Sequence, residues 1–550
     1  MKRSIYYLLA AFLCLTPLSS CTKMLEEESS MEVAKENYLT NAAEAELVLL
    51  GVYRNQTVQA MYGNNLSYLF GMIATDEAQP EGNKPIGWRS LPLNAFTTSD
   101  VNIQNSWAAL YTAIYCANDF LETIEQRLPS YTEADCKLAT LYIAEARALR
   151  AQFYFDLLRY YGHVALITHT AQSVQPAGSF VQATPEAVYQ FIEKDLLFAI
   201  DNLPYSNDND PRSEPSFRFS KGAAQGLLTK VYATWAGHPV QDTSKWEQAA
   251  RMAEALITSG KHQLQPNYET LWENSGNGIW APQESLLEVS FYSPTTGMAD
   301  LGSIGKANGV VANDIAGVRG RNSGNVRVVY TFIRDWEKKE SDKRYNLSIA
   351  NYKYADKSDR KLQTLLTTKT PELDPSGWQI FTPAKWDTEK YVGPANQLIN
   401  SDKSNVNWYI LRYTDVLLLY AEALNEWTGA PTPAAYDAVN QVRRRGFDLP
   451  VNEPSAEADL PAGLDTEAFR QAVRRERSYE LAFEGHRRFD LIRWGIYAQT
   501  VDETDTKLRR WYSEASYGAI SFTKKGKHEL FPIPQRDLDL MTKFKQNPGW

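Results

Sequence analysis

Apolar side chains recur at every third or fourth position over long stretches of the chain, which is the pattern of an amphipathic helix. The clearest case is the apolar stripe formed by Leu149, Phe153, Leu157 and Tyr160. Gly162 follows at once, and glycine readily adopts the positive φ that ends many helices. We therefore predict a helix over 133–161 that terminates at Gly162.

Further stretches have the same periodicity, and several of them form consecutive pairs with short connections. Thr184-Pro185 and Thr432-Pro433 are typical helix starts, with threonine as the cap and proline at the first helical position. The pairing suggests stacking of the tetratricopeptide (TPR) type, but no motif recurs at a fixed period, so the sequence supports helix pairs and not a regular solenoid. The additional predicted helices are 42–59, 107–127, 185–203, 221–235, 244–259, 410–427, 433–445 and 467–484.

Two long stretches, 62–100 and 263–407, lack this periodicity. They are rich in Gly, Pro, Asn and Trp and contain only short strand-like runs such as 286–291. Both are too long to be simple connections, and long irregular insertions on a scaffold often carry function. Because no long linker separates independent units, we expect one body over 38–550, with its helical scaffold mainly at 38–61, 101–260 and 408–550.

The first residues have the layout of a secretory signal. Lys2 and Arg3 precede the apolar run 5–15, and Leu18-Ser19-Ser20-Cys21 follows. This layout resembles the lipobox of bacterial lipoproteins, so we expect residues 1–20 to be a signal peptide and Cys21 to be lipidated. The acidic stretch 21–37 would then be a solvated tether. The alternative is an ordinary signal peptide followed by an unmodified cysteine.

The charge balance disfavours nucleic acid as a partner. The full chain carries −9, and removal of Lys2 and Arg3 with the signal peptide makes this −11. Such a surface repels phosphate backbones, so the basic run 443–445 is interpreted as a local feature of a solvated or ion-paired face. In the mature chain we expect no disulfide between Cys116 and Cys136, because the predicted helices place them too far apart along a helical hairpin.

Four separated blocks resemble the SusD/RagB family of surface lipoproteins. The most specific block lies near the C-terminus, and one block departs from the family pattern, with His163 and Ala165 where the family usually has Asp and Pro. The blocks are AEARALRAQFYF (144–155), LRYTDVLLLYAEALN (411–425), ERSYELAFEGHRRFDLIRWG (476–495) and LFPIP (530–534), with QNPGW closing the chain.

This resemblance implies a mostly α-helical fold, namely a right-handed superhelix of TPR-like helix pairs with long irregular insertions that carry short strands. It also implies a lipid-anchored protein of the outer membrane that faces the cell exterior and partners a SusC-like TonB-dependent transporter. Ligand contacts would come from the insertions. The TPR-like side, including 149–161 and 410–425, would face the transporter or serve packing.

One helix carries a stripe of carboxylates. Glu476, Glu480 and Glu484 are four residues apart and therefore share one face. Arginines are plentiful nearby, among them Arg477 and Arg493, so we interpret the stripe as an ion-paired structural network, with Asp490 accepting from a neighbouring arginine.

The sequence contains none of the common catalytic or metal-binding motifs. Its six histidines do not form a His-Glu-x-x-His arrangement, there is no Gly-x-Ser-x-Gly elbow, and the glycines at 302–305 are too close for a phosphate loop. Asp208, Asp210 and Glu214 could suggest calcium, but Pro211 and Arg212 break the loop pattern, so a solvated turn is expected. We expect no enzyme activity, no metal and no cofactor.

Several aromatic and polar residues lie among turn residues in the insertions, where a ring can stack on a sugar and polar groups can bond its hydroxyls. We predict an oligosaccharide-binding protein on this basis together with the resemblance. A peptide-binding member of the same family, or a helical surface glycoside hydrolase, are the alternatives. The candidate ligand residues are Trp88, Asn83, Arg89, Trp280, Tyr292, Arg319 and Arg321.

Overall fold

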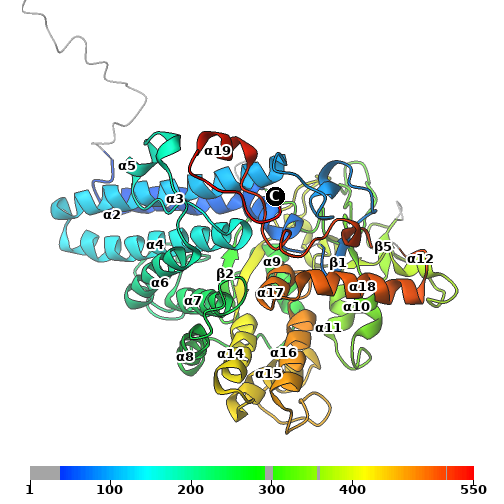
Figure 1. Ribbon diagram of the computed structural model, residues 1–550. Coiled ribbons are helices and arrows are strands. Elements are labelled where there is room, and N and C mark those ends of the chain that lie inside the picture. Colours follow the sequence, from blue (N-terminus) through cyan, green and yellow to red (C-terminus); the bar gives the residue numbers. More distant parts are fainter. Residues whose placement is uncertain (1–37, 73, 292–300, 356–358, 516) are drawn as a thin grey trace, which may run out of the picture.

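Helices account for most of the computed structural model (Figure 1), which describes residues 38–72, 74–291, 301–355, 359–515 and 517–550. The longer helices are α2 (Ala42–Arg54), α3 (Val101–Arg127), α4 (Glu133–Tyr161), α6 (Pro185–Asn202), α7 (Lys221–Ala236), α8 (Lys245–Thr258), α14 (Tyr413–Thr428), α15 (Pro433–Gly446), α16 (Thr466–Glu480) and α18 (Tyr497–Trp511). The shorter ones are α5 (Thr170–Ser173), α9 (Glu269–Asn277), α10 (Tyr330–Asp335), α11 (Arg344–Ser348), α12 (Pro375–Trp378), α13 (Thr388–Tyr391), α17 (Arg487–Arg493) and α19 (Gln535–Leu540).

Consecutive helices pack side by side and form an arc. Helix α3 packs on α4, α4 on α6, α6 on α7 and α7 on α8. Helix α8 then contacts α14, which packs on both α15 and α16, so the arc continues across the long insertion (Figure 1). The predicted mostly helical fold of helix pairs with short strands in the insertions is therefore confirmed.

Helix α4 occupies the middle of this arc, and its sequence explains why. The hydroxyl of Thr132 accepts from the Asp135 N–H at its start, and Gly162 has φ +67° at its end. Nearly every residue from Tyr142 to Tyr161 is buried, including Glu145, Arg150 and Asp156, whose charges are paired with Arg218, Asp195 and Arg159. The bounds of this helix were predicted correctly.

Four predicted helices differ from the structure by three or more residues at one end. The helix predicted over 42–59 ends at Arg54, and the helix predicted over 107–127 begins at Val101. The segment predicted as the start of a helix at 410 belongs to a strand, because Ile410 to Arg412 pair with the Ser285–Val289 strand before α14 begins. The helix predicted over 467–484 stops at Glu480, and Phe483 has φ +63°, a conformation that a regular helix does not allow.

The strands of the described residues form two-stranded antiparallel sheets within and beside the insertions. The pair β2 and β8 connects the long insertion to the start of α14, and the pair β1 and β3 connects the two insertions. The strands are β1 (Ala78–Pro80), β2 (Ser285–Val289), β3 (Val326–Val328), β4 (Ile349–Ala350), β5 (Tyr352–Tyr354), β6 (Gln363–Leu365), β7 (Thr382–Pro383) and β8 (Trp408–Arg412).

A buried ion network joins the insertion to the helical scaffold. Arg412 donates to Glu284 at 2.7 Å, to Glu480 at 3.0 Å and to Glu484 at 2.8 Å. Arg445 of α15 also donates to Glu284 and Glu480, at 3.0 and 2.6 Å. Five basic and five acidic groups balance one another in this network, which consists of Arg344, Lys385, Arg412, Arg443, Arg445, Glu284, Asp342, Glu476, Glu480 and Glu484.

The network keeps its carboxylates charged. Burial alone would raise the pKa of Glu480, but the guanidinium groups of Arg445, Arg412 and Arg344 lower it to about 2. The predicted structural role of the carboxylate stripe is thus confirmed, although Glu484 reaches the network from beyond the end of α16. Asp490 accepts from Arg477, as expected, at 2.9 Å.

A further sequence prediction concerns the cysteines. Cys116 and Cys136 are free thiols, so the expected lack of a disulfide between them is confirmed. Among the described residues, we find no helix with the length and apolar content needed to cross a bilayer.

Removal of one central arginine should destabilise the fold strongly. Arg412→Met leaves Glu284, Glu480 and Glu484 buried without their shared partner, and an uncompensated buried charge costs about 3–5 kcal/mol of unfolding free energy. Urea denaturation followed by tryptophan fluorescence measures the change. The control is Lys137→Met, which removes an exposed pair with Glu133 and should cost less than about 0.5 kcal/mol. A similar small loss for both variants would contradict the role of the network.

The stability of the protein should also depend on pH through the ionisation of Glu288, a buried residue of β2. Burial raises its pKa to about 7, although Ser285 and Asn407 donate hydrogen bonds to it. A raised pKa in the fold stabilises the protein below the ordinary glutamate pKa, and this contribution is lost as the pH rises through about 7.

Glu288→Gln should therefore raise the melting temperature relative to the native protein at pH 8 more than at pH 5, because glutamine does not ionise. Thermal unfolding at the two pH values tests this. Glu133→Gln, at an exposed position of α4, should show no such pH-dependent difference. An equal shift of Glu288→Gln at both pH values would contradict the assigned pKa.

Candidate functional site

Trp88 lies on a surface loop formed by residues 81–90. The ring is partly buried against the main core, and the guanidinium carbon of Arg89 lies 5.1 Å from the ring centroid. Arg89 also forms a 3.2 Å ion pair with Glu81 while its side chain remains 31% exposed. The ring and the guanidinium thus form a fixed pair at the surface, with Asn83 exposed in the same loop.

Two contacts hold this loop in place. The Glu81 N–H donates to the carbonyl of Asn325 at 2.7 Å, next to the β1–β3 pair. At the loop tip, a Cβ on Gly518 would lie only 3.1 Å from the Cα of Asn83, so the backbone of Asn83 packs directly on Gly518. The absence of a side chain at Gly518 therefore permits this close approach.

The loop at 313–325 is linked to the Trp88 loop and to residues 400–404. Arg327 donates to Glu81 at 3.4 Å, and the Arg321 N–H donates to the hydroxyl of Ser401 at 3.2 Å. We call these three segments, 81–90, 313–325 and 400–404, the loop face. The structure thereby connects Trp88, Asn83, Arg89 and Arg321, four of the predicted residues, through a short chain of contacts.

Arg319 has a different environment from the one expected for a ligand residue. Its side chain is 0% exposed, and its guanidinium donates to the carbonyls of Asn313, Arg360 and Tyr354 at 2.8, 2.6 and 3.3 Å. A guanidinium whose donors are engaged inside the loop cannot reach a ligand in solvent, so Arg319 is corrected to a structural residue that shapes the loop face.

The remaining predicted residues are Trp280 and Tyr292. Trp280 is partly buried, and its ring lies 6.0 Å from that of Phe217, in a loop that precedes α7. The structure gives it no contact with the loop face. Tyr292 and Cys21 lie outside the described residues.

Sequence reasoning missed other members of the loop face. Ile86 is 67% exposed two residues before Trp88, and it had no signal beyond its place among turn residues. Glu81, which follows β1, and Arg327, which lies in β3 beside the loop face, orient Arg89 and the loop at 313–325, but they are far apart in the sequence. Only the β1–β3 pairing brings them together.

Charged groups of the described residues are otherwise paired or scattered. Asp210 accepts from Arg212, and Asp208 pairs with Lys261, so the turn considered for calcium is closed by ion pairs. In the part of the chain that the structure describes, no cluster of three or more His, Cys, Asp and Glu side chains is arranged to hold a metal ion.

Comparison with protein families gives two matches. Residues 241–550 match the family described as "SusD family", and residues 18–233 match the family described as "Starch-binding associating with outer membrane". The SusD family is a family of non-catalytic binding proteins, so the prediction that the chain is not an enzyme is confirmed.

Relatives and solved structures agree with these matches. The chain is 25% identical to SusD-like protein P25 of Formosa agariphila, over 98% of this chain and 97% of that protein. It is 55% identical to a SusD homolog from Bacteroides thetaiotaomicron, with a TM-score of 0.90 over 95% of this chain and 100% of that one. A laminarin binding SusD-like protein is 25% identical, with a TM-score of 0.66 over 93% of this chain and 100% of that one. This chain belongs to the SusD family.

Proposed function

We propose that this protein captures oligosaccharides at the outer surface of the cell and delivers them to a SusC-like TonB-dependent transporter. The observation that carries the proposal is the fixed Trp88–Arg89 pair on the loop face of a member of a glycan-binding family. An aromatic ring held at the surface can stack on the apolar face of a sugar, and a neighbouring guanidinium can donate to its hydroxyls.

The rest of the loop face supplies polar groups for the same ligand. Asn83 and Arg321 are exposed, and the Arg89 guanidinium keeps part of its surface free beside the Trp88 ring. Ile86 adds an exposed apolar contact. Binding would combine stacking with several hydrogen bonds, each of modest net strength because the sugar hydroxyls exchange bonds to water for bonds to protein.

Membership of the family and the name of one relative support a glycan as the cargo. That relative is called a laminarin binding SusD-like protein. The family matched by residues 18–233 is associated with the outer membrane, which supports the proposed location. The proposed anchor is the lipidated Cys21, with the body facing the exterior. We take an oligosaccharide as the cargo of the loop face, and a peptide would be a distinct outcome of the test.

Trp88→Ala should weaken the binding of a captured oligosaccharide about tenfold or more, as expected for truncation of an aromatic anchor. An array of glycans and peptides identifies a ligand, and isothermal titration calorimetry then compares the variants. The matched control is Trp427→Ala, because Trp427 is 41% exposed on α14 and also has an arginine, Arg251, at 5.2 Å.

Unchanged affinity for Trp88→Ala would remove the loop face as the capture site. A selective response to peptides on the array would instead make the protein a peptide carrier.

Cys21→Ser should release the protein from the membrane. A thioether-linked lipid at the first mature residue would supply about 0.8 kcal/mol for each buried methylene, and serine cannot carry that linkage. Membrane fractionation with mass spectrometry of the mature N-terminus checks the prediction, with Cys116→Ser as the control. An unmodified N-terminus on a protein that is shed into the medium would overturn the proposed anchor.

A further inference from the structure

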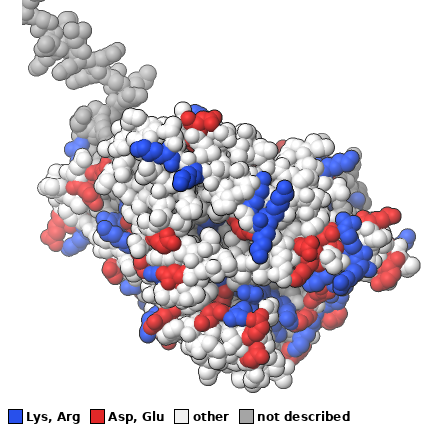
Figure 2. Space-filling model, viewed as in Figure 1, with Lys and Arg blue, Asp and Glu red and all other residues white. Residues whose placement is uncertain are grey.

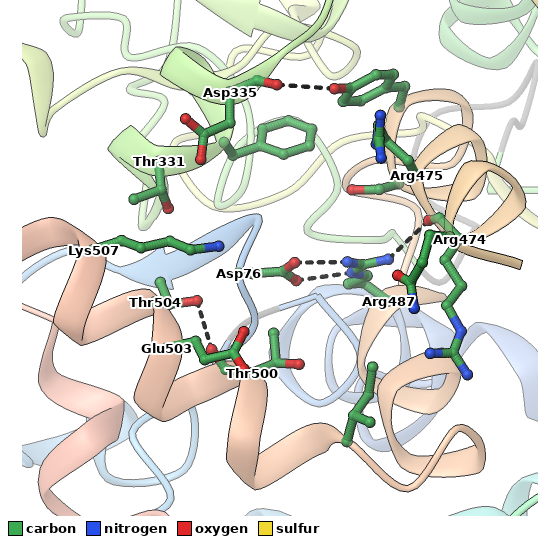
Figure 3. A pocket seen from close by; sticks show the side chains of 15 residues that line it. Asp76, Thr331, Asp335, Arg474, Arg475, Arg487, Thr500, Glu503, Thr504 and Lys507 are labelled. Carbon is green, nitrogen blue, oxygen red and sulfur yellow. Dashed lines mark hydrogen bonds and ion pairs between the residues drawn. The ribbon is translucent and has the colours of Figure 1, made fainter. Parts of the chain in front are cut away.

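A polar cavity of about 320 Å³ lies apart from the loop face, between α10, α16 and α18 (Figure 3). None of the residues that line it belongs to the loop face. Its volume falls in the range of small-molecule sites, which begins at roughly 300 Å³. Figure 2 shows basic and acidic side chains interspersed on the part of the surface over α16 and α18.

The middle of the cavity is occupied by a fixed ion pair. Arg487 donates to both oxygens of Asp76, at 2.8 and 2.6 Å, and donates to the Arg474 carbonyl at 3.2 Å. This pair leaves lone pairs on Asp76 that can accept from a ligand hydroxyl. Hydroxyl side chains also line the cavity, among them Thr331, Thr500 and Thr504.

Two cations on the walls lack a carboxylate partner. Within the described residues, neither Arg474 of α16 nor Lys507 of α18 forms a salt bridge, and Arg474 donates no hydrogen bond. The Nε of Arg474 is buried without a partner, and its guanidinium carbon lies 4.7 Å from the Trp494 ring centroid. A buried donor without a partner is costly, but this nitrogen is closed off from the cavity. The terminal amino groups of Arg474 are not closed off and donate no hydrogen bond, so they are the donors that a ligand can reach.

In contrast to these two cations, each acidic side chain of the cavity has a salt-bridge or hydrogen-bond partner. Asp335 pairs with Arg334, and Asp76 pairs with Arg487. Glu503 accepts from the amide of Gln499 at 2.8 Å. Arg475 is paired with Glu337, outside the cavity. Among the side chains that line the cavity, two cations form no salt bridge and one carboxylate lacks a cation, although Glu422 and Glu426 act on the charge of Arg474 from outside the cavity. The lining therefore favours an anionic ligand.

The two cations lie on opposite walls. Figure 3 shows Lys507 directed inward from α18 on one side, Arg474 on the other, and the Asp76–Arg487 pair between them. A ligand that contacts both cations at once has to reach across the cavity from one wall to the other. A ligand that uses both cations and the central pair has to be elongated and to carry hydroxyl groups as well as negative charge.

We propose that this cavity is a second ligand site, which binds a carboxylated oligosaccharide through Arg474, Lys507 and the Asp76–Arg487 pair. The negative charge of the ligand follows from the cavity alone. Its identification as a saccharide rests on the proposed function. Carboxylates would interact with Lys507 and with the free donors of Arg474, while sugar hydroxyls bond Asp76 and the threonines.

Calorimetry with matched probes tests this site. Trigalacturonate and a hyaluronan tetrasaccharide are carboxylated, galactotriose is a neutral trisaccharide, and inorganic sulfate is a small anion. At least one carboxylated probe should bind at least tenfold more tightly than galactotriose and sulfate, and its affinity should fall as salt is raised from 50 to 500 mM. Failure of both carboxylated probes to do so would overturn the proposal, as would equal binding of sulfate.

Variants assign the binding to the cavity. Lys507→Gln and Arg474→Gln should each lower the affinity for the carboxylated probe about tenfold. Because Lys507 is exposed on α18, its replacement leaves the fold intact. Arg509→Gln on the same helix removes an exposed cation outside the cavity and should have no effect. Unaltered affinity in both cavity variants would overturn the site.

The same variants distinguish a failure of the proposed function from a failure of the proposed second site. Trp88→Ala should leave the carboxylated probe unaffected, whereas a ligand of the loop face should be insensitive to Lys507→Gln. Loss of carboxylated-probe binding in Trp88→Ala would place that ligand on the loop face and overturn the second site.

Discussion

The structure depends on a buried array of balanced charge at the junction between the helical arc and the long insertion. Arg412 is its centre, because it ends β8, precedes α14 and contacts three glutamates from two separate segments, Glu284 before β2 and Glu480 and Glu484 at and just beyond the end of α16. Each of these groups would be costly if buried alone, so the segments are stable only when they come together. This mutual requirement fixes the insertion on the scaffold more specifically than apolar contact alone could, and it thereby fixes where the loop face stands.

The loop face itself relies on weaker and more local interactions. Its segments are connected by single hydrogen bonds, such as that from Glu81 to Asn325, and by the close contact of Asn83 with Gly518. Arg319 supports the loop at 313–325 from within by donating to three carbonyls. A rigid scaffold that carries loops held in this way is a common arrangement in binding proteins, because loops can vary without loss of the core.

Helices were predicted well where one periodic stripe and clear caps coincide, as in α4 with Thr132 and Gly162. The errors arose where tertiary contacts override local preference. The run at 410–412 is apolar enough for a helix, yet it pairs with β2, and Phe483 takes a positive φ just before Glu484 enters the ion network. Periodicity could identify Trp88 as a loop aromatic, but it could not show that Arg319 points inward. Nor could it identify the cavity, whose walls combine residues between 471 and 507 with Asp76 and with residues 331–335, which lie far away in the sequence.

The direct succession of β8 and α14 has a mechanical consequence. Strand β8 ends at Arg412 and α14 begins at Tyr413, so no linker residue lies between them that could act as a hinge. Rotation of the insertion together with Arg412 about that point would have to pull this arginine away from Glu480 and Glu484 of the scaffold. Large-scale bending at this junction is thus opposed by electrostatics as well as by chain connectivity.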